Sequence, residues 1–141
     1  MEHCLLVVAK LAYFHAASVV LHERDSSILP KFNKIVFRRE PPFSLVADVG
    51  YDMLVKSCQD HIELQKYVNK LTLTKHFILN SIFDVHKTKS NLKVLNHGDV
   101  WTNNILFQYT NSNKLADVVF VDFQFSCYTS PCLDLHYFLA T

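Results

Sequence analysis

The spacing of the apolar residues changes once along the chain, near Asn91, and this change limits the possible fold more than any other feature. Before Asn91, apolar residues recur at helical intervals, which predicts helices over residues 3–24, 43–58 and 60–87. After Asn91, short runs of β-branched and aromatic residues alternate with polar segments, a pattern that is typical of short strands. Helices followed by strands indicate an α+β fold.

The second half of the chain predicts a β-hairpin and a final helix. Residues 105–109 and 118–121 have the composition of strands, and the polar residues 110–114 between them have that of a turn. The length of 141 residues fits one domain. Its expected parts are a helical part over residues 1–90, polar loops over residues 93–126 and the start of a C-terminal helix over residues 131–141.

The first predicted helix has one recurrent apolar face, formed by Leu5, Ala9, Ala12, Ala16 and Val20. These residues lie three or four positions apart, which places them on one side of a helix. The alanines would allow a partner helix to approach this face closely. His15 belongs to the same helix, and we expect its ring to hydrogen-bond within the helical layer.

The composition excludes several classes of protein and of partner. Half of the residues are apolar, which excludes a disordered chain. The 14 Lys and Arg nearly balance the 13 Asp and Glu, so we expect neither a nucleic acid nor an acidic membrane surface as partner. Because Gly50 and Gly98 are the only two glycines, the chain cannot form a glycine-rich phosphate-binding loop.

The sequence also bears on location and on the state of the thiols. The N-terminal residues lack the basic start of a signal peptide, and we expect no stretch that approaches the ~20 apolar residues needed to span a bilayer. We therefore expect a cytoplasmic protein with free thiols. Cys127 and Cys132, with His136, raise the alternative of a zinc module, but their spacing is wrong for a zinc knuckle. Core or pocket-lining thiols are the expected role.

Two polar segments have the pattern that metal-assisted phosphoryl transfer requires. Asp99 is followed five positions later by Asn104, and the apolar run 118–121 ends at Asp122. In this chemistry one carboxylate accepts the proton of the attacking hydroxyl, while an amide oxygen and a second carboxylate hold Mg²⁺ on the nucleotide phosphates. Protein kinases have the same interval in H-R-D-x-x-x-x-N, followed by D-F-G; here Gly98 replaces the arginine and Gln124 the glycine.

These segments define the candidate site. Asp99 is the expected catalytic base or hydroxyl-orienting group, and Asn104 and Asp122 are the expected metal ligands. His97 is expected to fix the loop through a hydrogen bond, and Gly98 to permit a close backbone approach or an unusual φ. Trp101 lies between the base and the first metal ligand, where it either walls the acceptor-substrate site or packs the loop.

Four strings carry a resemblance to a known family: LAYFHAAS at residues 11–18, LNHGDVWTNN at 95–104, VDFQ at 121–124 and SPCLDL at 130–135. They resemble the insect ecdysteroid kinase-like (CHK kinase-like) family, in the choline kinase and aminoglycoside phosphotransferase group. The resemblance implies a protein-kinase-like fold, ATP and Mg²⁺, and phosphate transfer to the hydroxyl of a small molecule such as an ecdysteroid. Asp99, Asn104 and Asp122 carry over position by position. Asp134 matches an acid that supports the catalytic loop.

The resemblance is to the middle part of such a protein. The family's N-terminal lobe, with its phosphate-covering loop and ATP-anchoring lysine, has no counterpart here, and neither do the helices beyond residue 141. We therefore expect a partial C-terminal lobe, in which a helical layer and a short hairpin carry the catalytic and metal loops. The alternative is a catalytically inactive, truncated or degenerate fragment with at most a binding role.

Overall fold

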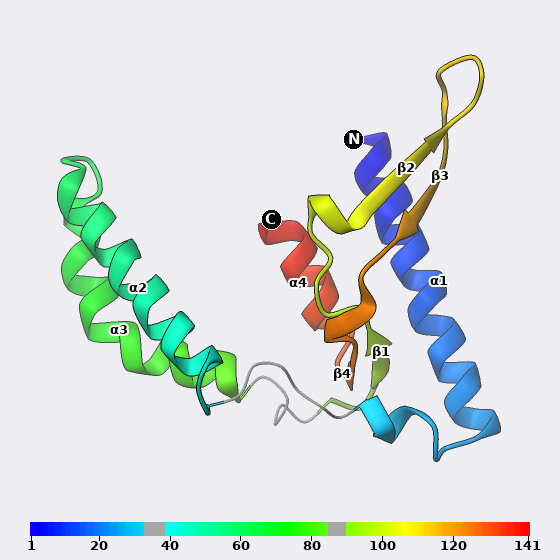
Figure 1. The fold of residues 1–141 in the computed structure, drawn as a ribbon, viewed down its shortest axis with the longest axis horizontal. Coiled ribbons are helices and arrows are strands. Elements are labelled where there is room, and N and C mark those ends of the chain that lie inside the picture. Colours follow the sequence, from blue (N-terminus) through cyan, green and yellow to red (C-terminus); the bar gives the residue numbers. More distant parts are fainter. Residues whose placement is uncertain (33–38, 85–89) are drawn as a thin grey trace. The chain divides into compact units, whose positions relative to one another are not determined.

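The structure is a computed structural model that describes residues 1–32, 39–84 and 90–141. The chain divides into two compact units (Figure 1). We call Met1–Ile35 with Lys89–Thr141 the strand unit and Val36–Thr88 the helix unit. The strand unit contains α1 (Glu2–Arg24), η1 (Leu29–Phe32), β1 (Val94–Asn96), η3 (Thr102–Asn104), β2 (Ile105–Tyr109), β3 (Leu115–Phe120), η4 (Phe123–Phe125), β4 (Cys127–Thr129) and α4 (Cys132–Ala140). The helix unit contains α2 (Phe43–Asp60) and α3 (Gln65–Phe83).

The expected α+β class is confirmed. The predicted hairpin is the antiparallel pair β2–β3, in which Ile105 lies opposite Phe120, although β3 begins at Leu115, three residues before the predicted start. A second antiparallel pair, β1–β4, was not expected, because each strand has only three residues and the two are far apart in the sequence. The third helix is shorter than predicted: α3 begins at Gln65, and residues 85–87 of the predicted range lie outside the described residues.

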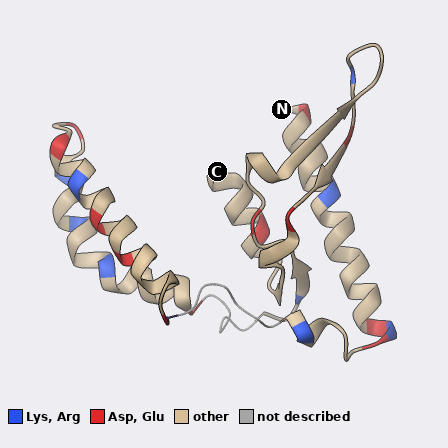
Figure 2. Ribbon diagram, viewed as in Figure 1, with Lys and Arg blue, Asp and Glu red and all other residues tan. Residues whose placement is uncertain are grey.

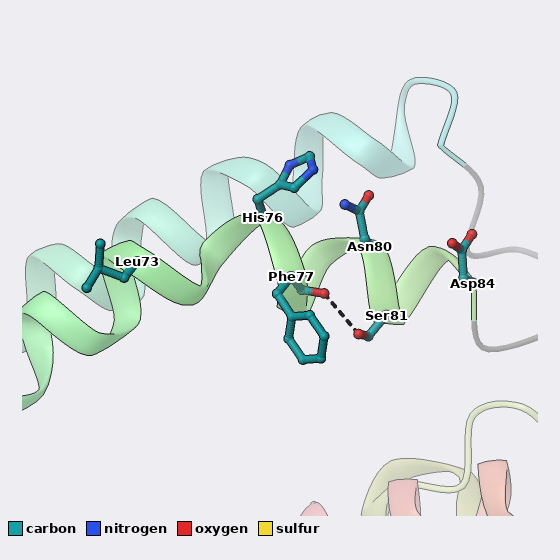
Figure 3. A pocket seen from close by; sticks show the side chains of 6 residues that line it. All are labelled: Leu73, His76, Phe77, Asn80, Ser81 and Asp84. Atoms are coloured by element: carbon teal, nitrogen blue, oxygen red, sulfur yellow. Dashed lines mark hydrogen bonds between the residues drawn. The ribbon is translucent and has the colours of Figure 1, made fainter.

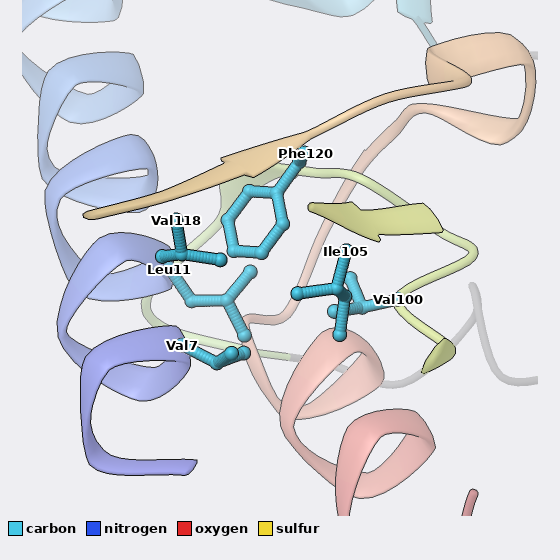
Figure 4. Close-up of a cluster of buried hydrophobic side chains, with 6 residues drawn as sticks. All are labelled: Val7, Leu11, Val100, Ile105, Val118 and Phe120. Carbon is cyan, nitrogen blue, oxygen red and sulfur yellow. The ribbon is translucent and has the colours of Figure 1, made fainter. Parts of the chain in front are cut away.

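One apolar cluster joins α1 to the hairpin of the strand unit (Figure 4). Its members are Val7 and Leu11 from α1, Val100 from the segment between β1 and η3, Ile105 from β2, and Val118 and Phe120 from β3. The helix thus covers one face of the two-stranded sheet, and Leu135 and Phe138 of α4 pack against the same cluster. The cluster fixes where the polar segments that follow β1 and β3 lie with respect to α1 and α4.

The predicted inward face of α1 was wrong. Leu5 is 66% exposed and Val20 is 45% exposed, and the alanines between them are exposed as well. The buried residues of this helix are Val7, Leu11, His15 and Ser18. Because α1 is apolar on nearly all sides, the apolar spacing did not identify its inward face. Val7 and Leu11 bury this face in the apolar cluster. His15 and Ser18 continue it, because they hydrogen-bond to Asp134 and Leu95.

The expectation about apolar stretches also needs correction. Among the described residues, α1 alone is long and apolar enough to cross a membrane by length and composition. The apolar run was underestimated because Lys10, His15 and Ser18 were counted as interruptions. The same helix packs on the sheet of the strand unit and buries His15 and Ser18 against polar partners.

The helix unit is built differently. Tyr51, Leu79 and Phe83 form its buried cluster, and the Tyr51 hydroxyl donates to the carbonyl of Leu71 at 2.9 Å. On the surface, Lys75 bonds Asp48 and Asp52. Over the described residues, Figure 2 shows the basic and acidic residues interspersed along the ribbon rather than gathered on one element.

Candidate functional site

The two polar segments of the predicted site are joined through their main chains. One segment follows β1 and runs through η3 into β2; the other follows β3. The N–H of Val121 donates to the carbonyl of Asn104 at 3.1 Å, and the carbonyl of Val121 accepts from His97 Nε2 at 2.9 Å. Asp122 directly follows Val121, so the structure brings the segment of Asp99 and Asn104 next to that of Asp122.

The His97 ring is fully buried and both of its nitrogens are used. Nε2 must donate, since its partner is the carbonyl of Val121. Nδ1 then accepts the N–H of Asp99 at 3.3 Å, which fixes the neutral tautomer with the proton on Nε2. The ring of Phe123 lies 4.5 Å from the His97 ring, centroid to centroid. His97 thus holds the loop and has no nitrogen left for a substrate.

Gly98 has both an unusual φ and a close backbone approach, the two features that the sequence predicted as alternatives. Its φ is +85°, in the left-handed region that favours glycine. A Cβ at this position would lie 2.2 Å from the carbonyl oxygen of Phe125, far inside a van der Waals contact. The backbone between His97 and Asp99 therefore passes against η4 at a distance that no side chain allows.

Asp134, in the first turn of α4, is the organising carboxylate of the site. It is 0% exposed, and a buried carboxylate is costly unless donors surround it. Oδ1 accepts the N–H of Gly98 at 2.8 Å. Oδ2 accepts the N–H of His97 at 2.8 Å and His15 Nε2 at 2.9 Å. One side chain of α4 thus fixes the two main-chain groups that precede Asp99 and links them to α1.

Sequence reasoning missed the partners of α1 in this site. His15 does form a hydrogen bond, but its partner Asp134 lies 119 residues away on α4. Ser18, one turn further along α1, donates to the carbonyl of His15 at 2.7 Å and accepts the N–H of Leu95 at 2.9 Å. The available signal was the placement of two polar residues within the apolar run 11–21, with partners that only the tertiary fold supplies.

The Asn104 side chain is oriented by Asp99. Its Nδ2 donates to Asp99 Oδ2 at 2.9 Å and to the Asp99 carbonyl at 3.0 Å. Both partners are acceptors, so the amide nitrogen faces Asp99 and the amide oxygen Oδ1 points away. No described residue donates to that oxygen. The amide therefore contacts the expected base with one end and leaves an oxygen ligand at the other.

Tyr137 is a site residue that sequence reasoning did not identify. Its hydroxyl donates to Asp99 Oδ1 at 2.9 Å. Burial raises the pKa of the Tyr137 phenol, and the hydrogen bond to Asp99 and the charge of that carboxylate raise this pKa further. Tyr137 follows Asp134 by three residues on α4, and this interval puts both side chains on one face of the helix.

Asp122 has an unusual backbone conformation for an aspartate. Its φ is 65° and its ψ is 66°, the left-handed region that non-glycine residues adopt rarely. Its side chain is exposed, and Oδ2 accepts Gln124 Nε2 at 3.1 Å. Such an outlier at the end of a strand motivates a functional hypothesis. Trp101, near Asp99 in the same loop, is 39% exposed, which leaves both of its predicted roles open.

The side-chain oxygens of Asn104 and Asp122 are of the kind that Mg²⁺ takes as ligands. Mg²⁺ keeps several waters and is bound in proteins through one or two side chains together with substrate phosphates. Asn104 offers a free amide oxygen, and Asp122 offers a carboxylate with one oxygen that takes no hydrogen bond from the described residues. In the described part of the chain no three His, Cys, Asp or Glu side chains gather to hold a metal. A metal held here would depend on these two oxygens, water and phosphate.

The cysteines considered for zinc are in different environments. Cys127 is buried in β4, and burial, with a smaller contribution from the charge of Asp134, raises the pKa of its thiol to about 11. Cys132 and His136 are exposed on α4. A thiol must be deprotonated to bind a metal, so the environment of Cys127 opposes a zinc site.

A hollow of about 430 Å³ lies elsewhere, on the helix unit (Figure 3). Its lining residues are Leu73, His76, Phe77, Asn80, Ser81 and Asp84. All of them belong to α3 or directly follow it, so the hollow is open on one face of a helix, and none of the predicted site residues lines it. The chemistry-bearing residues lie in the strand unit.

Comparison with known proteins identifies the family. The model of the ecdysteroid kinase-like family matches residues 1–141. No curated protein and no solved structure matches the chain. The prediction that the chain corresponds to the middle part of such a protein stays a prediction. The match extends over every residue from which the resemblance was drawn, and the chain belongs to the ecdysteroid kinase-like family.

Proposed function

We propose that the chain carries the catalytic and metal-binding loops of a phosphotransferase that uses ATP and Mg²⁺. Membership of the ecdysteroid kinase-like family implies kinase-like phosphotransferase activity in general. Within this class, the chain would serve the transfer of phosphate to the hydroxyl of a small molecule, an ecdysteroid or a similar alcohol. The fold would be part of a protein-kinase-like C-terminal lobe, in a cytoplasmic protein with neither nucleic acid nor membrane as partner.

A single observation supports this function best: the Asn104 amide touches Asp99 with its nitrogen, and its oxygen takes no hydrogen bond from the described residues. Phosphoryl transfer needs a proton acceptor beside the metal that holds the phosphates. An amide that bridges the two positions keeps them at a fixed separation. Asp122, joined to Asn104 through Val121, would be the second oxygen ligand.

The roles of the chain's residues follow from this geometry. An oxygen of Asp99 would take the proton of the acceptor hydroxyl while the hydroxyl oxygen bonds to the γ-phosphorus and the bond to the leaving ADP breaks. The proton then passes from Asp99 to solvent. Asn104 and Asp122 would hold Mg²⁺, which neutralises charge on the phosphates. His97, Gly98 and Asp134 would keep the loop in position.

The test uses the longest product that the gene encodes, incubated with ATP, Mg²⁺ and a panel of ecdysteroids and simpler alcohols. Phosphorylated product is measured for the wild type and for Asp99→Asn and Asp122→Asn. We expect Asp99→Asn to lose turnover by about 10²–10⁴-fold, the usual contribution of a positioned base. Asp122→Asn should also lose turnover, because it weakens an oxygen ligand of the metal. Asp117→Asn is the matched control, because Asp117 lies on β3, pairs with Lys10 of α1 and belongs to no part of the site.

The outcomes separate the proposal from its alternative. Wild-type turnover in Asp99→Asn or Asp122→Asn would contradict the roles assigned to these residues. A folded wild-type protein that phosphorylates no alcohol would favour the alternative, an inactive fragment with at most a binding role.

A further inference from the structure

We propose that Tyr137 is a positioning residue for Asp99: its hydroxyl, together with the amide of Asn104, holds the Asp99 carboxylate in one orientation. The inference rests on the proposed function, because orientation matters only if Asp99 receives a proton. It concerns a residue that carries no part of the motif from which the site was predicted.

The two carboxylate oxygens of Asp99 each take one donor. Tyr137 donates to Oδ1 at 2.9 Å, and Asn104 Nδ2 donates to Oδ2 at 2.9 Å. The donors come from different elements, α4 and η3. A single donor would leave the carboxylate free to rotate about its Cβ–Cγ bond. Two donors on opposite oxygens, held by separate elements, fix the plane of the group.

One turn of α4 fixes both the backbone and the side chain of the loop. Asp134 holds the N–H groups of His97 and Gly98. Tyr137, three residues later on the same helix face, holds the carboxylate of the next residue, Asp99. A shift of α4 would therefore move the main chain of the loop and the Asp99 carboxylate together. The carboxylate would keep its position relative to the backbone that carries it.

Tyr137 leaves room for a substrate and does not replace Asp99 as the base. A carboxylate offers about four lone-pair positions, and Tyr137 and Asn104 use two of them. The raised pKa of the Tyr137 phenol, from burial and from the hydrogen bond and charge of Asp99, keeps it protonated and able to donate. The hydroxyl thus orients the carboxylate while the remaining lone pairs stay open to an acceptor hydroxyl.

The kinetic test compares two tyrosine-to-phenylalanine variants in the same full-length protein. Tyr137→Phe removes only the hydroxyl, and we expect kcat to fall about 10- to 100-fold, the cost of a misplaced catalytic group. The KM for ATP should be unchanged, whereas a general loss of structure would change it. Tyr109→Phe is the control, since it removes an exposed hydroxyl that lies 2.7 Å from His3 Nε2, and its kcat should equal that of the wild type.

A second measurement needs no activity. The ring carbon resonances of ¹³C-labelled tyrosines are followed through alkaline pH, and the signal of Tyr137 is assigned by its loss in Tyr137→Phe. In Asp99→Asn the carboxylate charge is removed, so the pKa of Tyr137 should fall toward that of an ordinary tyrosine while remaining raised by burial.

Each result decides the inference. A lower kcat in Tyr137→Phe, with unchanged KM for ATP and an Asp99-dependent titration of Tyr137, supports it. Wild-type kcat in Tyr137→Phe would overturn the inference while leaving the proposed function in place. An unchanged titration of Tyr137 in Asp99→Asn would overturn the contact itself. A wild type without turnover would overturn the proposed function and the kinetic role of Tyr137, whereas the titration would still report on the contact.

Discussion

The strand unit and the helix unit differ in what they bury. Over the described residues, every buried polar side chain belongs to the strand unit, namely His15, Ser18, Asn96, His97, Asn104, Thr129 and Asp134. The helix unit buries Tyr51, Cys58, Leu79 and Phe83. A buried polar group is costly unless it is hydrogen-bonded, and a fully satisfied network has few alternative arrangements. The strand unit is therefore built to hold particular atoms in place, whereas the helix unit depends on apolar contact.

The largest expected effect tests this contrast at its centre. Asp134→Ala leaves His15 and the N–H groups of His97 and Gly98 buried without their acceptor. We expect the free energy of unfolding of the strand unit to fall by about 3–5 kcal/mol, the usual cost of breaking a buried charged network. The single tryptophan, Trp101, belongs to this unit, so its fluorescence during urea unfolding gives the measurement.

Asp52→Ala in the helix unit is the matched control for Asp134→Ala, and its unfolding in urea is followed by circular dichroism because Trp101 belongs to the other unit. Asp52 bonds Lys75 on the surface, where solvent screening leaves an ion pair little effect on stability. A comparable loss of stability in the two variants would mean that the buried network is no more important than a surface pair, and the contrast between the units would fail.

The two glycines, one in each unit, sharpen the comparison. Gly98→Ala places a Cβ 2.2 Å from the Phe125 carbonyl oxygen at a φ of +85°, and we expect a loss of about 2–4 kcal/mol from strain and overpacking. Gly50→Ala meets nothing within 4 Å and lies inside α2, so it should stabilise the helix unit by about 0.5–1 kcal/mol. Circular dichroism during thermal unfolding compares the two variants. Equal effects, or a stabilising Gly98→Ala, would contradict the conformation of the loop.

The sequence predicted those features whose causes are local. The hairpin of β2 and β3 follows from strand composition on either side of a polar turn, and α2 and α3 follow from apolar spacing. The pair β1–β4 escaped prediction because strands of three residues carry little pattern and their pairing is decided by the tertiary fold. The inward face of α1 escaped it because a helix that is apolar on nearly all sides has no unique periodicity.

The same division holds for the site. Asp99 and Asn104 were found because their interval is a property of one loop, and the structure brings them into contact. Tyr137 was missed because an aromatic residue in an apolar helix has the pattern of a core residue. Its hydroxyl acquires a role only when α4 lies beside the loop. Hydrogen bonds between groups far apart in the chain, such as that of His15 with Asp134, join partners that only the tertiary fold brings together.

A further difference in burial lies within the strand unit and concerns the reactivity of two thiols. Burial and the charge of Asp134 raise the pKa of Cys127 to about 11 from an ordinary 9.0, whereas Cys132 is exposed at the start of α4. Only the thiolate attacks iodoacetamide, and this rise in pKa lowers the thiolate fraction ~100-fold near neutral pH. Cys127 should therefore be alkylated at least ~100-fold more slowly than Cys132, as followed by mass spectrometry of the intact fold. Equal rates would mean that the Cys127 thiol in β4 is as accessible to the reagent as the Cys132 thiol. The hydrogen bonds around Asp134 would then not prevent local opening of the strand unit.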